Sequence, residues 1–228
     1  DFYTGRGWKR GEHQTLLSAK GEMLTAAIEA VSYRARVAVE LQVRAFDDGN
    51  TLFTLGTPLG ARDLSVKADV ATDYLGELER IIAADGIDVG QSYTTRGTYS
   101  IATPQQLLND GVNYPAWIRE RYLQLPDDLP LRVGEETSRI LDEADSASPY
   151  ASVIIINEYL RLLEIDFNLR KPPARRDVVD YLLFDSRKTY FDLSATTMVV
   201  MLRTQGIPAR IAVGYALDTE DTSGLTYS

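Results

Sequence analysis

The fold is decided by Asp185-Ser-Arg-Lys-Thr-Tyr-Phe-Asp-Leu-Ser-Ala-Thr-Thr-Met-Val-Val-Met-Leu-Arg-Thr-Gln-Gly-Ile-Pro-Ala-Arg-Ile-Ala-Val-Gly-Tyr215. Residues 193–203 are apolar on most faces, which predicts a helix sunk into a core, and Asp192 is expected to cap its N-terminus. Gly206 supplies the left-handed residue after the last turn, and Pro208 cannot continue the helical ladder. The run therefore predicts one buried helix that ends at about Arg203.

The spacing of apolar residues changes to two after this helix. One face collects Ile207, Ala209, Ile211, Val213, Tyr215 and Leu217. This alternation predicts a strand directly after the helix. A helix that begins inside a protein also offers unpaired N–H groups and the positive end of its dipole to an anion. A cysteine at that position would readily become a thiolate.

These residues resemble the transglutaminase-like superfamily, in which a Gly-Tyr-Cys-Glu-type turn opens such a helix and a Leu-Arg-x-x-Gly-Ile-Pro-Ala-Arg-x-x-x-Gly-Tyr run closes it. The closing run is matched by Leu202, Arg203, Gly206, Ile207, Pro208, Ala209, Arg210, Gly214 and Tyr215. In the opening turn, Thr189-Tyr190-Phe191-Asp192 occupies the Gly-Tyr-Cys-Glu place. The nucleophile position therefore carries Phe191, and a phenyl ring cannot attack a carbonyl.

Other segments are similar to bacterial membrane-anchored transglutaminase-like proteins of the TgpA type: residues 3–8, 122–130, 158–161 and 180–185. The resemblance is strong from Tyr122 onward and weak before Ser92. It implies a papain-like α+β core whose later strands present a His and then an Asp, in a region that faces outside the cytoplasm between transmembrane segments. We expect the chain to be a segment of a longer bacterial membrane protein, with an incomplete core.

Composition is that of a globular protein, with 228 residues and 44% apolar content. A formal charge of −9 disfavours nucleic acid and anionic membrane surfaces as partners. The longest apolar runs fall short of the roughly 20 residues that cross a bilayer. The chain has no Cys, which excludes disulfides, thiolate metal sites and every cysteine-based mechanism within it. No cofactor or metal is expected.

The chain is expected to have three parts: a β-rich module at residues 1–103, a helical connector at 104–130, and the incomplete transglutaminase-like core at 131–228. Strands are predicted at residues 34–45, 51–55, 64–70 and 92–101, with a helical turn within 75–84. This spacing favours an antiparallel sandwich or sheet. Helices are predicted at residues 103–111, 133–144, 149–163 and 178–184, so the fold class is α+β.

Candidate catalytic groups other than a thiol have weak support. His13 lies in a polar stretch without ligand-like companions and is expected on the surface. Ser194 and Thr196 have no evident activating base, so we expect ordinary hydroxyls that bond back within the helix. Asp166 and Asp185, with Asp192, are carboxylates whose spacing alone does not establish an acid–base pair.

The conspicuous remaining side chains are expected to be structural. Arg210 and Tyr215 are predicted to pin the turn from helix to strand and to fill the edge of the core. Trp8 and Trp117 are predicted to be anchors of their modules.

Phe191 supports two hypotheses. In the first, an aromatic side chain fills the volume of a lost active site, and this chain is not an enzyme. In the second, a groove with Tyr190, Phe191 and Asp192 survives as a binding surface for a peptide or an acyl-like chain, and the expected partner is a protein or peptide of the cell envelope. A further alternative is a cell-envelope scaffold in which the β module does the binding, whereas intact relatives would be cysteine-type acyl transferases or peptidases.

Overall fold

The structure is a computed structural model that describes residues 2–24, 36–71 and 78–214. It consists of two compact units. Asp1–Gly11 and Thr103–Ala212 form a helical unit, and Glu12–Ala102 belong to a β unit. The predicted α+β class is confirmed.

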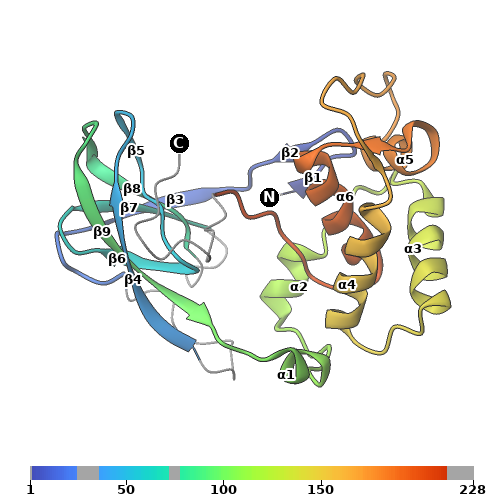
Figure 1. Ribbon diagram of the computed structural model, residues 1–228, viewed down its shortest axis with the longest axis horizontal. Coiled ribbons are helices and arrows are strands. Elements are labelled where there is room, and N and C mark those ends of the chain that lie inside the picture. Colours follow the sequence, from blue (N-terminus) through green and yellow to red (C-terminus); the bar gives the residue numbers. More distant parts are fainter. Residues whose placement is uncertain (1, 25–35, 72–77, 215–228) are drawn as a thin grey trace. The chain divides into compact units, whose positions relative to one another are not determined.

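The β unit contains two antiparallel sheets (Figure 1). The four-stranded sheet has the order β3-β7-β8-β5 and the three-stranded sheet the order β4-β9-β6. Their bounds are β3 His13–Ser18, β4 Arg36–Arg44, β5 Gly49–Thr51, β6 Thr57–Ala61, β7 Val66–Ala71, β8 Leu78–Ile87 and β9 Ser92–Ser100. Buried residues of both sheets share one apolar core, including Ala61, Val66, Ile81 and Tyr93. The predicted antiparallel sheet structure is therefore present.

The helical turn predicted within residues 75–84 is wrong for residues 78–84, which lie in β8. This strand pairs with β7 on one side and with β5 on the other, and Ile81 and Ala83 are buried. Sheet pairing and burial outweigh the local helix preference of such a segment. Residues 75–77 lie outside the described residues.

The helical unit begins with the hairpin β1 (Phe2–Tyr3) and β2 (Trp8–Lys9). Its remaining elements are α1 Pro104–Leu108, α2 Ala116–Tyr122, α3 Leu131–Glu143, α4 Pro149–Leu160, β10 Glu164–Ile165, α5 Val178–Tyr181, the π-helix η2 Leu182–Ser186, β11 Lys188–Thr189 and α6 Phe191–Thr204. The helices α3, α4 and α6 lie against one another (Figure 1). Fully buried Val133, Ile156, Val200 and Met201 join them in one core.

The end of α6 follows the sequence prediction. Gln205 is the C-cap, and Gly206 has the left-handed φ of 72°. The N–H of Gly206 donates to the carbonyl of Arg203, and that of Ile207 donates to the carbonyl of Leu202, at 3.1 and 3.0 Å. These two bonds form a Schellman motif, which only a residue tolerant of positive φ closes without strain.

The strand predicted after α6 is wrong for the described residues 207–214, which contain no strand. Apart from the bond of Ile207 in the Schellman motif, the backbone bond shown for these residues runs from the N–H of Ala209 to the carbonyl of Tyr122 at 3.2 Å. A strand requires hydrogen bonds to a neighbouring strand as well as an alternating pattern, and Val213 is 96% exposed. Tyr215 and Leu217 lie outside the described residues.

The N-terminal hairpin packs with the helices, whereas the sequence prediction placed it in the β-rich module. Trp8 donates from Nε1 to Oγ1 of Thr196 on α6 at 3.1 Å. Gln124, between α2 and α3, exchanges two bonds with the backbone of Tyr3, at 2.8 and 3.1 Å. Trp8 is thus an anchor of the helical unit, and the expected connector at 104–130 is part of the same unit.

The described part of the chain contains no helix that is long and apolar enough to cross a membrane.

Candidate functional site

The candidate site is the first turn of α6, where the resemblance places the nucleophile. Tyr190 is the N-cap residue and makes no side-chain capping bond, while Asp192 lies inside the first turn. The prediction that Asp192 caps the helix is therefore wrong, because a capping side chain must precede the helix to reach its free N–H groups. Asp192 instead adds a negative charge near the positive end of the dipole.

The expected buried start of this helix is also wrong. Phe191 is 70% exposed and Asp192 is exposed, whereas the buried residues of α6 begin at Thr196. The helix is thus a core element over its later turns, and its first turn faces solvent.

A two-stranded parallel sheet leads into this turn. Ile165 of β10 pairs with Thr189 of β11, and Glu164 pairs with Lys188. The Lys188 Nζ lies 2.9 Å from a carboxylate oxygen of Glu164 and 3.4 Å from one of Asp166, and these partners raise the pKa of Lys188. The short sheet and its ion pairs hold the chain in place just before α6.

An exposed aromatic pair covers the position expected for the nucleophile. The ring of Phe191 meets that of Phe167 edge to face, with centroids 5.5 Å apart. Phe167, which follows β10, is 70% exposed as well. Sequence reasoning missed Phe167, although a large apolar residue in the polar run Asp166–Asn168 was a signal. Exposed apolar side chains that touch one another mark a contact surface more often than single exposed apolar residues do.

The hydroxyl groups of α6 are engaged in structural bonds, but not in the way predicted. Ser194 Oγ lies 2.9 Å from Oγ1 of buried Thr189, and Thr196 accepts the bond from Trp8. The bond back to the helix backbone is made by Thr197, whose Oγ1 donates to the carbonyl of Leu193 at 2.7 Å. In the described part of the chain, neither Ser194 nor Thr196 bonds a histidine or a carboxylate.

The three candidate carboxylates do not share a partner. Asp166 pairs with Lys188 and also accepts the N–H of Asn168 at 2.9 Å. Asp185 forms an ion pair with Arg176. His13 is an exposed residue of β3 in the other unit. The described residues also hold no group of three or more His, Cys, Asp or Glu side chains that could bind a metal ion.

Arg203 performs the pinning role that sequence reasoning assigned to Arg210. Its guanidinium is buried and donates twice to the carbonyl of Ala209, at 3.0 and 2.7 Å, and once to that of Gln124 at 2.8 Å. It also lies over the Trp8 ring, 5.1 Å from the centroid. Burial lowers the pKa of Arg203 to about 10, so it stays charged at neutral pH.

Arg210 is exposed and reaches the Tyr122 hydroxyl at 3.4 Å. Pro208 is half-buried and Gly214 exposed, both beyond the end of α6. These residues shape the segment after the helix and contribute no reactive group to the candidate site.

Comparisons with known proteins support the resemblance. The family described as the Transglutaminase-like superfamily matches residues 139–226. The protein YebA of Bacillus subtilis, which is described as uncharacterized, is 28% identical over 94% of this chain and 30% of its own length. A Protein-glutamine gamma-glutamyltransferase of Pseudomonas aeruginosa is 29% identical over 51% of this chain and 17% of its own length.

A solved structure has the same fold. The crystal structure of the periplasmic domain of TgpA from Pseudomonas aeruginosa aligns with a TM-score of 0.53 at 17% identity, covering 90% of this chain and 62% of that one. At this identity the match concerns the fold. The chain spans less than a third of the length of the two curated relatives, so it corresponds to one region of such proteins.

Proposed function

We propose that residues 139–226, which match the transglutaminase-like superfamily, form a non-catalytic member of it. We further propose that the chain lies in the extracytoplasmic part of a membrane-anchored bacterial protein. The periplasmic origin of the Pseudomonas structure supports this location.

One observation carries the proposal: the helix that should begin with the nucleophile begins with Phe191. The chemistry implied by the resemblance is acyl transfer or amide hydrolysis through a thioester. In it the Cys thiolate attacks the acyl carbon, a His acts as the base, and an Asp orients that His. A phenyl ring cannot form a thioester, and no cysteine occurs anywhere in the chain. The neighbouring Ser194 is bonded to Thr189, and no described residue bonds it as an activating base.

Activity measurements on the full-length protein test the absence of catalysis. The protein is incubated with a glutamine-donor peptide and a fluorescent amine, beside the Pseudomonas glutamyltransferase as a positive control. We expect no incorporation above background. Turnover that disappears in the Ser194→Ala variant would show that a hydroxyl has replaced the thiol and would overturn the proposal.

A restored thiol tests whether this helix start is the nucleophile position. Phe191→Cys places a thiol at the first residue of a 14-residue helix, where the dipole lowers a thiol pKa. Leu162→Cys is the matched control, since Leu162 is an exposed apolar residue of the same unit that lies in a turn. We expect iodoacetamide to alkylate the variant at 191 several-fold faster near neutral pH. Equal rates would mean that the site cannot activate a thiol.

A second candidate function is binding of a protein or peptide of the cell envelope, and the aromatic pair favours it. The rings of Phe167 and Phe191 are exposed and in contact with each other. Ile165, two residues before Phe167, is exposed as well. Such a surface suits an apolar side chain of an extended peptide.

Peptide capture separates this candidate from a purely structural domain. A library of biotinylated envelope-protein peptides is screened against the wild type and Phe167→Ala. Binding that the alanine variant loses favours the binding surface. Binding that the variant retains would place recognition elsewhere, and Ile154→Ala, an exposed change on α4, controls for nonspecific losses.

A further inference from the structure

A pocket of the helical unit whose lining includes no residue of α6 is rich in arginine. It has a volume of about 410 Å³ and is lined by four arginines, Arg6, Arg132, Arg175 and Arg176. Three carboxylates, Asp128, Asp177 and Asp180, also line it. The chain as a whole carries a formal charge of −9, so this pocket is a local excess of positive charge.

The N-terminal hairpin is fixed to the wall of this pocket. The carbonyl of Gly5 accepts the N–H of Val178 at 2.8 Å, and the Tyr3 hydroxyl donates to Asp177 at 3.1 Å. A Cβ at Gly5 would lie only 3.1 Å from the Asp177 carboxylate, so the hairpin tip sits as close as its backbone allows. This attachment holds Arg6, the next residue, at the pocket.

Two of the three carboxylates are already satisfied inside the protein. Buried Asp180 receives two bonds from Arg132, at 2.5 and 2.8 Å, and lies 3.1 Å from Arg176. Asp177 accepts the N–H groups of Val179 and Asp180 at 2.8 and 2.9 Å. These two acids therefore have little capacity to neutralise further charge in the pocket.

The other charged groups leave an excess of donors. Arg6 and Arg175 have no hydrogen-bond or ion-pair partner among the described residues, and only exposed Asp128 is left to oppose them. Arg175 adopts a left-handed φ of 71°, an uncommon conformation for a residue with a side chain. Arg176 pairs with Asp185 and Asp180, but its buried Nε has no acceptor in the described chain.

The N-terminus of α3 adds to this excess. Pro130, its N-cap, and Arg132, in its first turn, both line the pocket. The cap offers no side-chain acceptor, and the first turn of this 13-residue helix has no acidic residue. The N–H of Val133 donates to the Pro130 carbonyl at 3.0 Å, but no side chain caps the helix and no acidic residue of the first turn offsets the positive end of the dipole.

We propose that this pocket binds an oxyanion, a phosphate or carboxylate group of a ligand, through Arg6 and Arg175 and the start of α3. Arginine forks match the paired oxygens of either group, and a helix N-terminus provides additional N–H donors. The site is separate from the first turn of α6, so it does not depend on whether that turn retains any chemistry.

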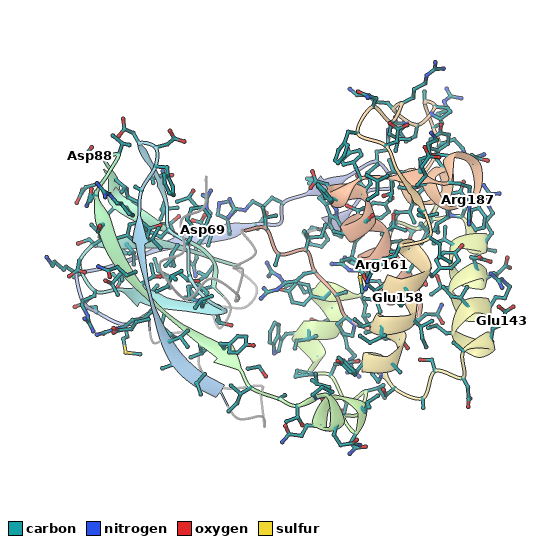
Figure 2. All side chains as sticks on the ribbon, viewed as in Figure 1. Asp69, Asp88, Glu143, Glu158, Arg161 and Arg187 are labelled. Carbon is teal, nitrogen blue, oxygen red and sulfur yellow. The ribbon has the colours of Figure 1, made fainter. Side chains whose placement is uncertain are left out.

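Calorimetric titration of the 228-residue chain with sodium phosphate and with sodium acetate, at constant ionic strength set by sodium chloride, tests the proposal. We expect saturable binding of at least one anion, about tenfold weaker in Arg6→Gln and in Arg175→Gln. Arg161→Gln is the control, because Arg161 is exposed beside Glu158 at the end of α4 (Figure 2) and is not among the residues that line the pocket. The control is expected to bind as the wild type does.

The two anions distinguish the source of the oxyanion. Tighter phosphate binding indicates a phosphate ester, and tighter acetate binding indicates a carboxylate ligand. No saturable binding of either anion, or equal affinity in wild type and in the Arg6→Gln, Arg175→Gln double variant, overturns the proposal. Unchanged thermal unfolding of the double variant ensures that a loss of binding is not a loss of fold.

Discussion

Replacing Arg203 by alanine is expected to destabilise the helical unit by about 3 kcal/mol. The guanidinium is buried and makes three bonds to two carbonyl oxygens, those of Ala209 and Gln124. It therefore ties the segment after α6 to the segment after α2, and both to the Trp8 ring of the N-terminal hairpin.

The magnitude follows from what the alanine leaves behind. Two carbonyls lose charged donors, at about 1–3 kcal/mol each when no water replaces them. The contact with the Trp8 ring contributes about 0.5–2 kcal/mol. Against these losses, alanine removes the cost of burying a charge, the same cost that lowers the pKa of Arg203 to about 10. About 3 kcal/mol is the balance of these terms.

Urea unfolding followed by tryptophan fluorescence measures this change. The chain has two tryptophans, Trp8 and Trp117, and both belong to the helical unit, so the signal reports on that unit. Arg210→Ala is the matched control from the same sequence motif. Arg210 is exposed and its bond to Tyr122 is long, at 3.4 Å, so about 0.5 kcal/mol is expected. Free energies of unfolding that agree within about 0.5 kcal/mol for the two variants would refute the assignment.

Three further predictions concern individual side chains. Burial raises the pKa of Asp177 above its ordinary value of 3.8, so its neutral form is favoured in the fold; in pH-dependent unfolding, wild type should lose stability relative to Asp177→Asn as pH rises through that raised pKa. Glu136 has the opposite sign, because the bond from Arg139 lowers its pKa below 4.5; wild type should lose its advantage over Glu136→Gln as pH falls through the lowered pKa, and an unchanged difference would contradict this. Phe191→Ala should change stability by no more than about 0.5 kcal/mol because the ring is exposed, whereas Met201→Ala, fully buried, should cost about 2–5 kcal/mol; similar Tm values for these two variants would be inconsistent with the burial of α6.

Local signals in the sequence were sufficient for the helices. The end of α6 was predictable because Gly206 and Pro208 act within one turn, and Thr103 with Pro104 gave the start of α1 in the same way. The segment after Pro149 was predictable because Ile156, Leu160 and Leu163 recur on one stripe, and all three are buried. Each of these features depends on neighbours within a few residues.

Features that depend on distant partners were not predictable. Trp8 was assigned to the β module by proximity in sequence, yet its hydrogen bond goes to Thr196. Arg203 and Arg210 look equivalent in the motif, and only the positions of Gln124 and Ala209 distinguish the buried one from the exposed one. The residues after Ile207 do alternate between apolar and other side chains. Such an alternation predicts which face of a strand would be apolar, but it does not show whether a neighbouring strand is available to pair with it.

The division of α6 into an exposed first turn and a buried remainder separates the stability of the helix from the identity of residue 191. The core contacts of α6 are made by side chains of its later turns, such as Val199, Val200 and Met201. A substitution at exposed residue 191 would leave the packing of these side chains in place. A thiol at position 191 contributes to chemistry through the N–H groups and dipole of the helix start, which any side chain there would experience. Stability therefore constrains residue 191 only weakly, and a phenyl ring in contact with Phe167 is accommodated there at little cost to folding.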